Sequence, residues 1–450
     1  MLDSLYTEAI QKKEKLIEQV DVLSKIKSID VEKYWFEEPI TKSGNAVKIA
    51  AGDGSYNSKK YLSFNFYAVS AVSLIYTDKL DKIESIELDT LSHQSFLEDR
   101  LRNIMGLFEI KNAIKSIEDF DIDYYLDDGS LLGDLIRPFP IEKEISSKKK
   151  DEIVNFFKEK LQNEIRNADL GISSSKFKKE FKDLFSDENS STDNGIVSLD
   201  KKSSTDNSKI SNIDENSDNN SKEIDEDNLI AFLENIEKLL ALSHLLKNKK
   251  KIIAISKTSS SNDLLHANIS DMAIFDAFSK KQGFSKPYYK YMSSEMKREF
   301  PVENEFFRDL VFTVFFARLD NNKNIIKIEL PYKADTDEIR KILSDIKRDS
   351  VEGYPYLLKK AHNEVVIKRK NIEELSNSIC CIWLYVILLI LSIIVIFSIL
   401  SMKENEGKNA LFGGIDKMKF KKMVVPGDRL KLEVKIIKRQ NKTLIIIKVG

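Results

Sequence analysis

The segment from Asp187 to Asn228 constrains the fold most, because it cannot contribute to a hydrophobic core. It consists mainly of Ser, Asn, Asp, Lys and Glu, and the pentapeptide SSTDN occurs in it twice. So few apolar side chains do not offset the entropy lost on ordering. We therefore expect a disordered acidic insert over residues 187–227, with an acidic docking segment as the alternative. The residues on its two sides must then build one domain together.

The first part, residues 1–186, begins with a pattern typical of an amphipathic helix. Residues 3–27 carry apolar side chains at mixed three- and four-residue spacing, separated by Lys and Glu. The pattern predicts one long helical arm. Such an arm either pairs two subunits or packs on its own domain.

The pattern then changes to short segments rich in β-branched and aromatic residues, which predict strands at 46–51, 61–76 and 83–88. We expect these strands to form a curled antiparallel sheet. The rest of the first part is predicted to contain a helix over 94–117, a strand over 121–126 that runs into two aspartates, and further helices to about residue 185.

The second part, residues 228–377, shows the same mixture of elements. A helix is predicted over 229–247 and another over 335–347, and strands are predicted in KIIAIS, PYYKYM, DLVFTVFFARLD and NIIKIELPY. The body is therefore predicted to be an α/β protein of the α+β type, in which helices surround a mixed, largely antiparallel sheet.

Charge and cysteine content exclude several classes of protein. The net charge is only −1, so a nucleic-acid-binding surface would have to be a local patch. The two cysteines, Cys380 and Cys381, are adjacent and cannot form a disulfide framework or a cysteine-based zinc site. The polar N-terminus does not resemble a secretory signal. We expect a cytoplasmic body.

An uncharged run follows the body. Residues 376–402 carry no charge, and residues 379–400 are nearly all apolar, which is long enough to cross a bilayer as a helix. The run predicts a transmembrane helix over 378–402 that tethers the body to the membrane through 379–400. A buried core helix is the alternative.

Two Asp-Gly-Ser tripeptides each follow an apolar strand and carry the chemistry of this sequence. Asp53 follows KIAAG and Asp128 follows DYYLD, so each strand is expected to deliver a carboxylate to its end. A single Asp-Gly is usually a turn. Together with Glu109 on the intervening helix, however, the two aspartates offer oxygen ligands for one or two divalent cations. Such a site suits phosphodiester hydrolysis.

Four motifs in order resemble the NurA family of DNA-end-processing nucleases. They are GDGS at 52–55, LDDGSLLGDL at 126–135, the strand-plus-lysine pattern IAISKTS and GYPYLLKKAH at 353–362. The resemblance implies a ribonuclease-H-like nuclease core with manganese, or alternatively magnesium, as its metal. It also implies single-strand endonuclease and 5′-to-3′ exonuclease activity on single-stranded DNA and duplex ends. The implied partners are a second copy of the chain and a HerA-type hexameric DNA-translocating ATPase.

The resemblance also suggests roles for individual residues. Asp53 and Asp128 correspond to metal-binding aspartates, with Glu109 as the helix carboxylate and His362 as a metal ligand or proton shuttle. Tyr354 and Lys257 complete the catalytic set, and Lys257 is expected to meet a phosphate or the leaving oxygen. Two alternatives stay open: Glu98 for Glu109, and Asp127 for Asp128.

The last part of the chain resembles another family. Residues 410–442 are similar to hotdog-fold 3-hydroxyacyl-carrier-protein dehydratases, but the upstream motifs with that family's catalytic histidine and acidic residue have no counterpart here. We therefore interpret residues 403–450 as a short β-rich fragment without dehydratase activity. A gene fusion or a frameshift is the simplest explanation of the tail.

Two other functions compete with the nuclease. The first is a catalytically impaired, membrane-anchored fusion protein located by its apolar helix. The second is an actin-like phosphotransferase that binds ATP phosphates at its paired Asp-Gly-Ser turns.

Overall fold

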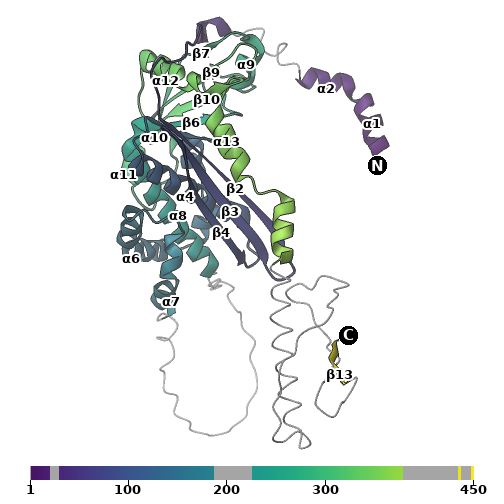
Figure 1. The fold of residues 1–450 in the computed structure, drawn as a ribbon, viewed down its shortest axis with the longest axis vertical. Helices are drawn as coiled ribbons and strands as arrows, with labels where there is room; N and C mark the ends of the chain where they lie inside the picture. Colours follow the sequence, from purple (N-terminus) through teal and green to yellow (C-terminus); the bar gives the residue numbers. More distant parts are fainter. Residues whose placement is uncertain (1, 21–29, 187–225, 379–433, 437–446, 450) are drawn as a thin grey trace, which may run out of the picture. The chain divides into compact units, whose positions relative to one another are not determined.

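The computed structural model describes residues 2–20, 30–186, 226–378, 434–436 and 447–449 (Figure 1). The chain is divided into two compact units. The first comprises Met1–Tyr56, Val69–Glu87 and Phe96–Val366, and the second comprises Asn57–Ala68, Leu88–Ser95 and Ile367–Gly450. Every residue with a predicted catalytic role falls in the first unit.

One mixed sheet organises the fold, in the order β1-β7-β9-β10-β6-β5-β2-β3-β4, with β8 paired to β9. β2 is parallel to β5, and β5 is parallel to β6, whereas β6, β10 and β9 are successively antiparallel. The strands are β1 (Trp35–Glu37), β2 (Ile49–Lys60), β3 (Asn65–Tyr76), β4 (Leu80–Leu91), β5 (Tyr124–Asp127), β6 (Ile252–Ser256), β7 (Gly283–Ser285), β8 (Tyr288–Tyr291), β9 (Val311–Arg318) and β10 (Ile326–Leu330).

Side chains alternate between two hydrophobic cores, one on each face of the sheet. On β2, Ala50 belongs to the first core, while Ile49 and Ala51 belong to the second. On β5, Tyr125 belongs to the first core and Leu126 to the second. The mixed α/β expectation is confirmed, because the sheet is covered by helices on both faces.

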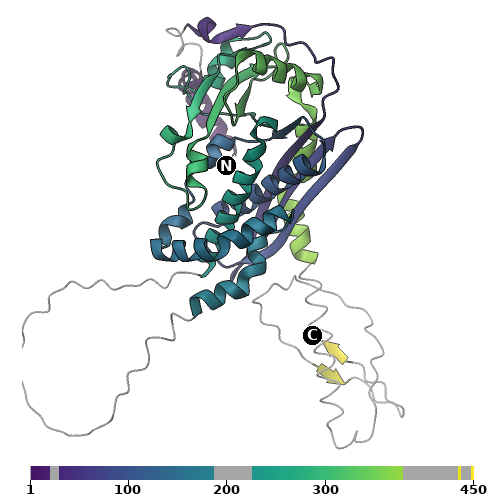
Figure 2. The ribbon, with the colours of Figure 1, turned by 90° about the vertical axis from the view of Figure 1, so that its left-hand side faces the viewer.

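The first core packs under α4, α6 and α8, and the second packs under α12 and α13 (Figures 1 and 2). These helices are α4 (Leu97–Asp119), α6 (Ser147–Arg166), α8 (Glu226–Leu245), α12 (Thr336–Arg348) and α13 (Tyr356–Val365). Shorter helices are α5 (Leu131–Ile136), α7 (Lys178–Ser186), α9 (Asp271–Phe278), α10 (Met292–Glu295) and α11 (Asn304–Arg308). α4 precedes the insert and α8 follows it, so the chain on the two sides of the insert forms one core.

Two sequence expectations are wrong in detail. The single N-terminal helix expected over 3–27 is instead α1 (Leu2–Gln11) followed by α2 (Lys13–Val20), and residues 21–27 lie outside the described residues. β2 does not end before Asp53 but continues to Lys60, so Asp53 lies inside a strand and not in a turn. Pairing of β2 with β5 and β3 supplies hydrogen bonds that override the local turn preference of Asp-Gly.

The second unit contains the far ends of β2–β4 and the residues after α13. Phe66, Ala68 and Ile372 form its small core, and the side-chain amide of Asn57 donates to the Ile367 carbonyl at 3.0 Å. Near the C-terminus, β13 (Val434–Ile436) pairs antiparallel with β14 (Ile447–Val449).

Among the described residues, no helix is both long and apolar enough to cross a membrane. The predicted transmembrane segment 378–402 lies outside the described residues except for Ser378, and so does most of the insert 187–227.

Candidate metal centre

Asp53 and His362 come from different layers of the fold and meet on the second-core face of the sheet. Asp53 points to the same face of β2 as Ala51, because side chains two residues apart share a face. His362 lies on α13, which covers that face. The His362 Nδ1 atom is 2.7 Å from Asp53 Oδ2, and the Gly54 N–H donates to Asp53 Oδ1 at 2.9 Å.

Asp128 follows the last residue of β5 and joins the same group. The Lys257 Nζ atom donates to Asp128 Oδ2 at 2.7 Å, and the Tyr354 hydroxyl donates to Asp128 Oδ1 at 3.3 Å. Lys257 Nζ also lies 4.7 Å from the centre of the Tyr354 ring, which is a cation–π contact. Lys257 directly follows β6.

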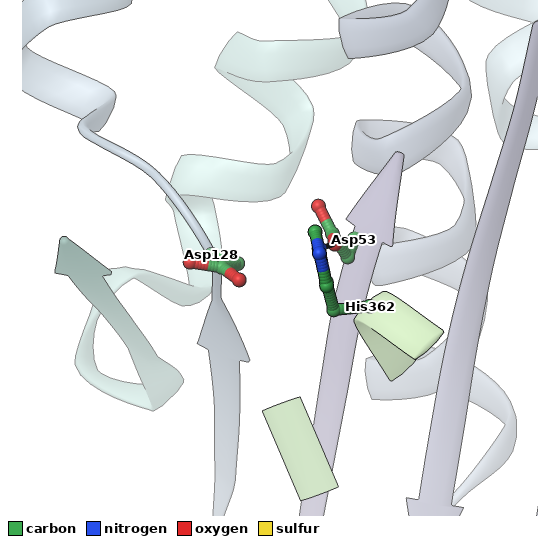
Figure 3. A group of neighbouring side chains, drawn as sticks. All are labelled: Asp53, Asp128 and His362. Carbon is green, nitrogen blue, oxygen red and sulfur yellow. Dashed lines mark hydrogen bonds and ion pairs between the residues drawn. The ribbon is translucent and has the colours of Figure 1, made fainter. Parts of the chain in front are cut away.

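Asp53, Asp128 and His362 therefore converge, as Figure 3 shows. One ligand atom from each of the three lies within 4.8 Å of the others. Among the described residues, these three form the group of acidic and histidine side chains that is close enough to hold a metal ion. Two carboxylates and one imidazole suit a divalent metal ion, and the carboxylates in particular suit manganese. The parallel strands β2 and β5 bring the aspartates side by side, and α13 adds the histidine.

Glu109 approaches from the opposite face, where α4 packs, and its carboxyl group lies against Gly54. A Cβ atom at Gly54 would be 2.6 Å from Glu109 Oε1. Gly52 is constrained in the same way, since a Cβ there would be 1.9 Å from the Tyr125 hydroxyl oxygen. Glycine at these two positions thus lets polar groups approach the backbone of β2 next to Asp53.

Burial and mutual repulsion raise the pKa values of several carboxyl groups. The pKa of Asp53 is raised by burial and by Asp128, against the opposing effect of the His362 contact. Burial and the charges of Asp127 and Asp53 raise the pKa of Glu109 well above its usual value. Burial, followed by Asp134 and Asp128, raises the pKa of Asp127 to about 8. A bound cation would relieve this repulsion.

The geometry distinguishes the two pairs of alternatives. Asp127 lies opposite Gly52 in the β2–β5 register, and next to it Asp128 contributes a ligand atom to the converging group. Glu98 is hydrogen-bonded to Tyr56, whose pKa is raised by burial and by this contact. Glu109 instead lies beside Gly54. Asp128 thus belongs to the converging group, whereas Glu109 lies outside that group.

Glu329 on β10 is a residue that the sequence analysis did not single out. It is fully buried and accepts hydrogen bonds from the Ser130 hydroxyl at 2.7 Å and from the Leu132 N–H at 3.0 Å. It thereby holds the loop that carries Asp128. The signal in the sequence was an acidic residue inside the apolar strand IIKIEL, where a buried charge requires partners.

Comparison with known proteins adds an independent finding. A family model described as the NurA domain matches residues 47–367. The probable DNA double-strand break repair nuclease NurA of Methanocaldococcus jannaschii is 30% identical over 390 residues, covering 82% of this chain and 87% of that protein. The NurA nuclease of Saccharolobus solfataricus is 26% identical over 354 residues, covering 77% of this chain and 86% of that protein.

Solved structures show the same fold. The crystal structure of the Sulfolobus solfataricus NurA nuclease has a TM-score of 0.58 at 21% identity and covers 83% of this chain and 95% of that chain. A crystal structure of NurA bound to dAMP and manganese also has a TM-score of 0.58, at 17% identity, and covers 84% of this chain and 97% of that chain.

The tail matches a different family, described as the FabA-like domain, over residues 387–450. The 3-hydroxyacyl-[acyl-carrier-protein] dehydratase FabZ of Staphylococcus saprophyticus is 63% identical over 41 residues, which is 9% of this chain and 28% of that enzyme. The expected resemblance of the tail is confirmed.

Proposed function

Because this chain belongs to the NurA family, we propose that it is a manganese-dependent DNA nuclease that cuts single strands internally and degrades DNA from 5′ to 3′. The observation that carries the proposal is the convergence of Asp53, Asp128 and His362 where β5 ends beside β2. The crystal structure of a NurA protein with dAMP and manganese supports both the metal and the substrate class.

We assign the metal to Asp53, Asp128 and His362, with Glu109 as the further carboxylate. Bound there, a divalent ion supplies positive charge for the scissile phosphate and lowers the pKa of a water molecule. Burial and then neighbouring carboxylates raise the pKa values of Asp53 and Glu109, and a cation bound there would favour their charged forms. This donor set therefore fits the ion.

The protein's own groups then orient the reaction. Lys257 touches Asp128, and its ammonium can reach a phosphate oxygen at the edge of the metal site. Burial and Asp128 raise the pKa of Tyr354 far above its usual value, so its hydroxyl stays protonated and donates. His362 is half exposed with Nδ1 toward Asp53, which leaves Nε2 to accept or deliver a proton when the ring is not a ligand.

The test is a cleavage assay of Asp53→Asn beside Asp78→Asn, an exposed aspartate in the turn after β3. Labelled single- and double-stranded oligonucleotides and circular single strands report polarity and internal cutting with manganese, with magnesium or with chelator. We expect Asp53→Asn to lose on the order of 10³-fold in rate, because the metal loses a ligand. Degradation by Asp53→Asn at the rate of Asp78→Asn contradicts the proposal.

We further propose a ribonuclease-H-like core. The order β4-β3-β2-β5-β6, with β2 parallel to β5 and β5 parallel to β6, supports this assignment. A crystal structure with a nucleotide and manganese bound tests whether both contact the end of β5.

A homodimeric assembly is also proposed, together with a HerA-type DNA-translocating ATPase as partner and a cytoplasmic location. The family resemblance motivates all three. The dimer has added support from α1 and α2, which carry exposed apolar side chains, namely Leu5, Tyr6, Ile10, Leu16 and Ile17. Light scattering of Ile10→Glu beside the unsubstituted chain tests the dimer, and co-purification with the ATPase tests the partner.

The two competing functions received no support from the comparisons, since the matches over residues 47–367 are to NurA proteins. Assays of residues 1–377 beside the full chain measure whether the dehydratase-like tail reduces activity.

A further inference from the structure

A hollow on the first-core face of the sheet lies between α4, α5 and α8, outside the converging group at Asp53. Its volume is ≈ 540 Å³ when the space open to solvent is included. Four cationic and two anionic side chains line it: Arg102, Arg137, Lys238, Arg298, Asp99 and Asp134. Glu142 also pairs with Arg298, so the surplus is one positive charge. The hollow therefore attracts an anion.

Two buried N–H groups at this hollow have no hydrogen-bond partner among the described residues. The Asn103 side chain is 5% exposed, and its Nδ2 atom is unpaired. The Arg298 Nε atom is also unpaired, although Nη1 of the same side chain binds Glu142 and Nη2 binds the Arg137 carbonyl, each at 3.0 Å. Since buried donors are normally satisfied, a ligand with acceptor oxygens fits here.

The hollow lies beside the proposed catalytic centre along α4. Asn103 precedes Glu109 by six residues, about 9 Å of helical rise at ~1.5 Å per residue. Between them, Lys238 Nζ lies against Gly106, where a Cβ atom would be only 2.8 Å from it.

We propose that this hollow binds a phosphate group of the same DNA strand whose scissile phosphodiester lies at Asp53 and Asp128. Asn103 Nδ2 and Arg298 Nε donate to the phosphate oxygens, and Lys238 and Arg137 supply charge. The inference rests on the proposed nuclease function. The phosphate is either an internal diester or the phosphomonoester at a strand end, and both present the same acceptor oxygens.

The first test measures binding without cleavage, by fluorescence anisotropy of a labelled single-stranded oligonucleotide and the full chain in chelator. Asn103→Asp replaces a donor by a carboxylate, and we expect binding to weaken about tenfold, the effect of losing a hydrogen bond to a charged group. Lys238→Gln should weaken binding at all sequences and reduce the salt slope by about 1.

The controls separate a binding defect from a folding defect. Arg340→Gln removes a cation that pairs with Glu38 away from the hollow, and it should bind within about twofold of the unsubstituted chain. Arg137→Gln is a third test variant at the hollow. Its side chain is half exposed, so this variant can be measured even if Asn103→Asp fails to fold. Unchanged binding by folded Asn103→Asp, Lys238→Gln and Arg137→Gln overturns the proposal.

The second test identifies the source of the phosphate with 5′-phosphorylated and 5′-hydroxyl oligonucleotides. A larger defect of Asn103→Asp on the phosphorylated strand supports the phosphate site and assigns it to the strand end, whereas equal defects support it and assign it to an internal diester. If no strand is cut but the binding defects remain, the nuclease function fails and the phosphate site stands. If cleavage is normal and no variant binds more weakly, the site fails alone.

Discussion

Gly54 follows Asp53 in β2 and faces the carboxyl group of Glu109. We predict that Gly54→Ala lowers the cleavage rate about 10²-fold, because displacement of a catalytic group by ~1 Å has effects of this size. The added Cβ would stand 2.6 Å from Glu109 Oε1 and from Met105 Cγ, so Glu109 must move. Rates at saturating manganese with a single-stranded substrate provide the measurement.

Gly129→Ala is the matched control for this substitution. A Cβ at Gly129 meets Asp127 Oδ2 at 3.4 Å, which is an ordinary contact. We expect its rate to stay within about threefold of the unsubstituted chain. Equal losses in Gly54→Ala and Gly129→Ala would show that the position of Glu109 does not matter for cleavage.

The residues of the candidate site were partly readable from the sequence. Asp53, Asp128 and His362 stand in family-like motifs, and the structure brings them together. Glu329 and the unpaired Asn103 could not be found in this way, because their surroundings are created by strands and helices distant in the sequence. Hydrogen-bond partners of a buried group depend on the fold and not on local spacing.

At the scale of elements, α4 and α8 are joined by two buried ion pairs. Arg100 binds Glu234 through two hydrogen bonds, of 2.9 and 2.8 Å, and Lys111 Nζ lies 2.6 Å from Glu237 Oε1. Glu237 also accepts the backbone N–H groups of Ser173 and Ser174, at 2.9 and 2.8 Å. These contacts fix α4, and with it Glu109, against the helix that follows the insert.

We predict that Glu237→Ala lowers the free energy of unfolding by about 3–5 kcal/mol, because Lys111 and two backbone donors lose a buried partner. Urea unfolding followed by circular dichroism measures the loss. Glu180→Ala on α7 removes an exposed partner of Lys160, and this substitution should cost less than about 1 kcal/mol. A loss for Glu237→Ala as small as that of Glu180→Ala would contradict the importance of the buried pair.

Element boundaries were the weaker part of the sequence analysis. The strand ending expected at residue 51 is displaced to Lys60, since neighbouring strands supply ladder hydrogen bonds where local preference favoured a turn. The helix over 94–117 was placed nearly correctly, as α4, because its long apolar pattern leaves little choice of start and end.

At the scale of the whole molecule, the acidic centre makes metal-free stability depend on pH. Burial and neighbouring carboxylates raise the pKa of Asp127 to about 8, above the unfolded value of about 3.9. Between these values the folded state holds more protons than the unfolded state, so stability falls as pH rises and the full loss is reached above the folded pKa. Asp53 and Glu109 act in the same direction.

We predict that the melting temperature in chelator falls more steeply from about pH 6 to about pH 8.5 for the unsubstituted chain than for Asp127→Asn, which has no charge to bury. Manganese should raise it more at the higher pH, since protons compete with the metal for the carboxylates. Thermal unfolding with manganese and with chelator measures both effects. If the melting temperatures of the two proteins fall equally with pH, Asp127 is not the cause of the pH dependence.

One contact of 2.7 Å in the candidate centre joins positions 309 residues apart, Asp53 and His362. A ribosome must therefore complete all but the last fifth of the polypeptide before the imidazole exists. Interrupted translation products that stop earlier hold the aspartates without their histidine. On the proposed function, we expect such shortened products to bind the metal weakly and to cut DNA slowly.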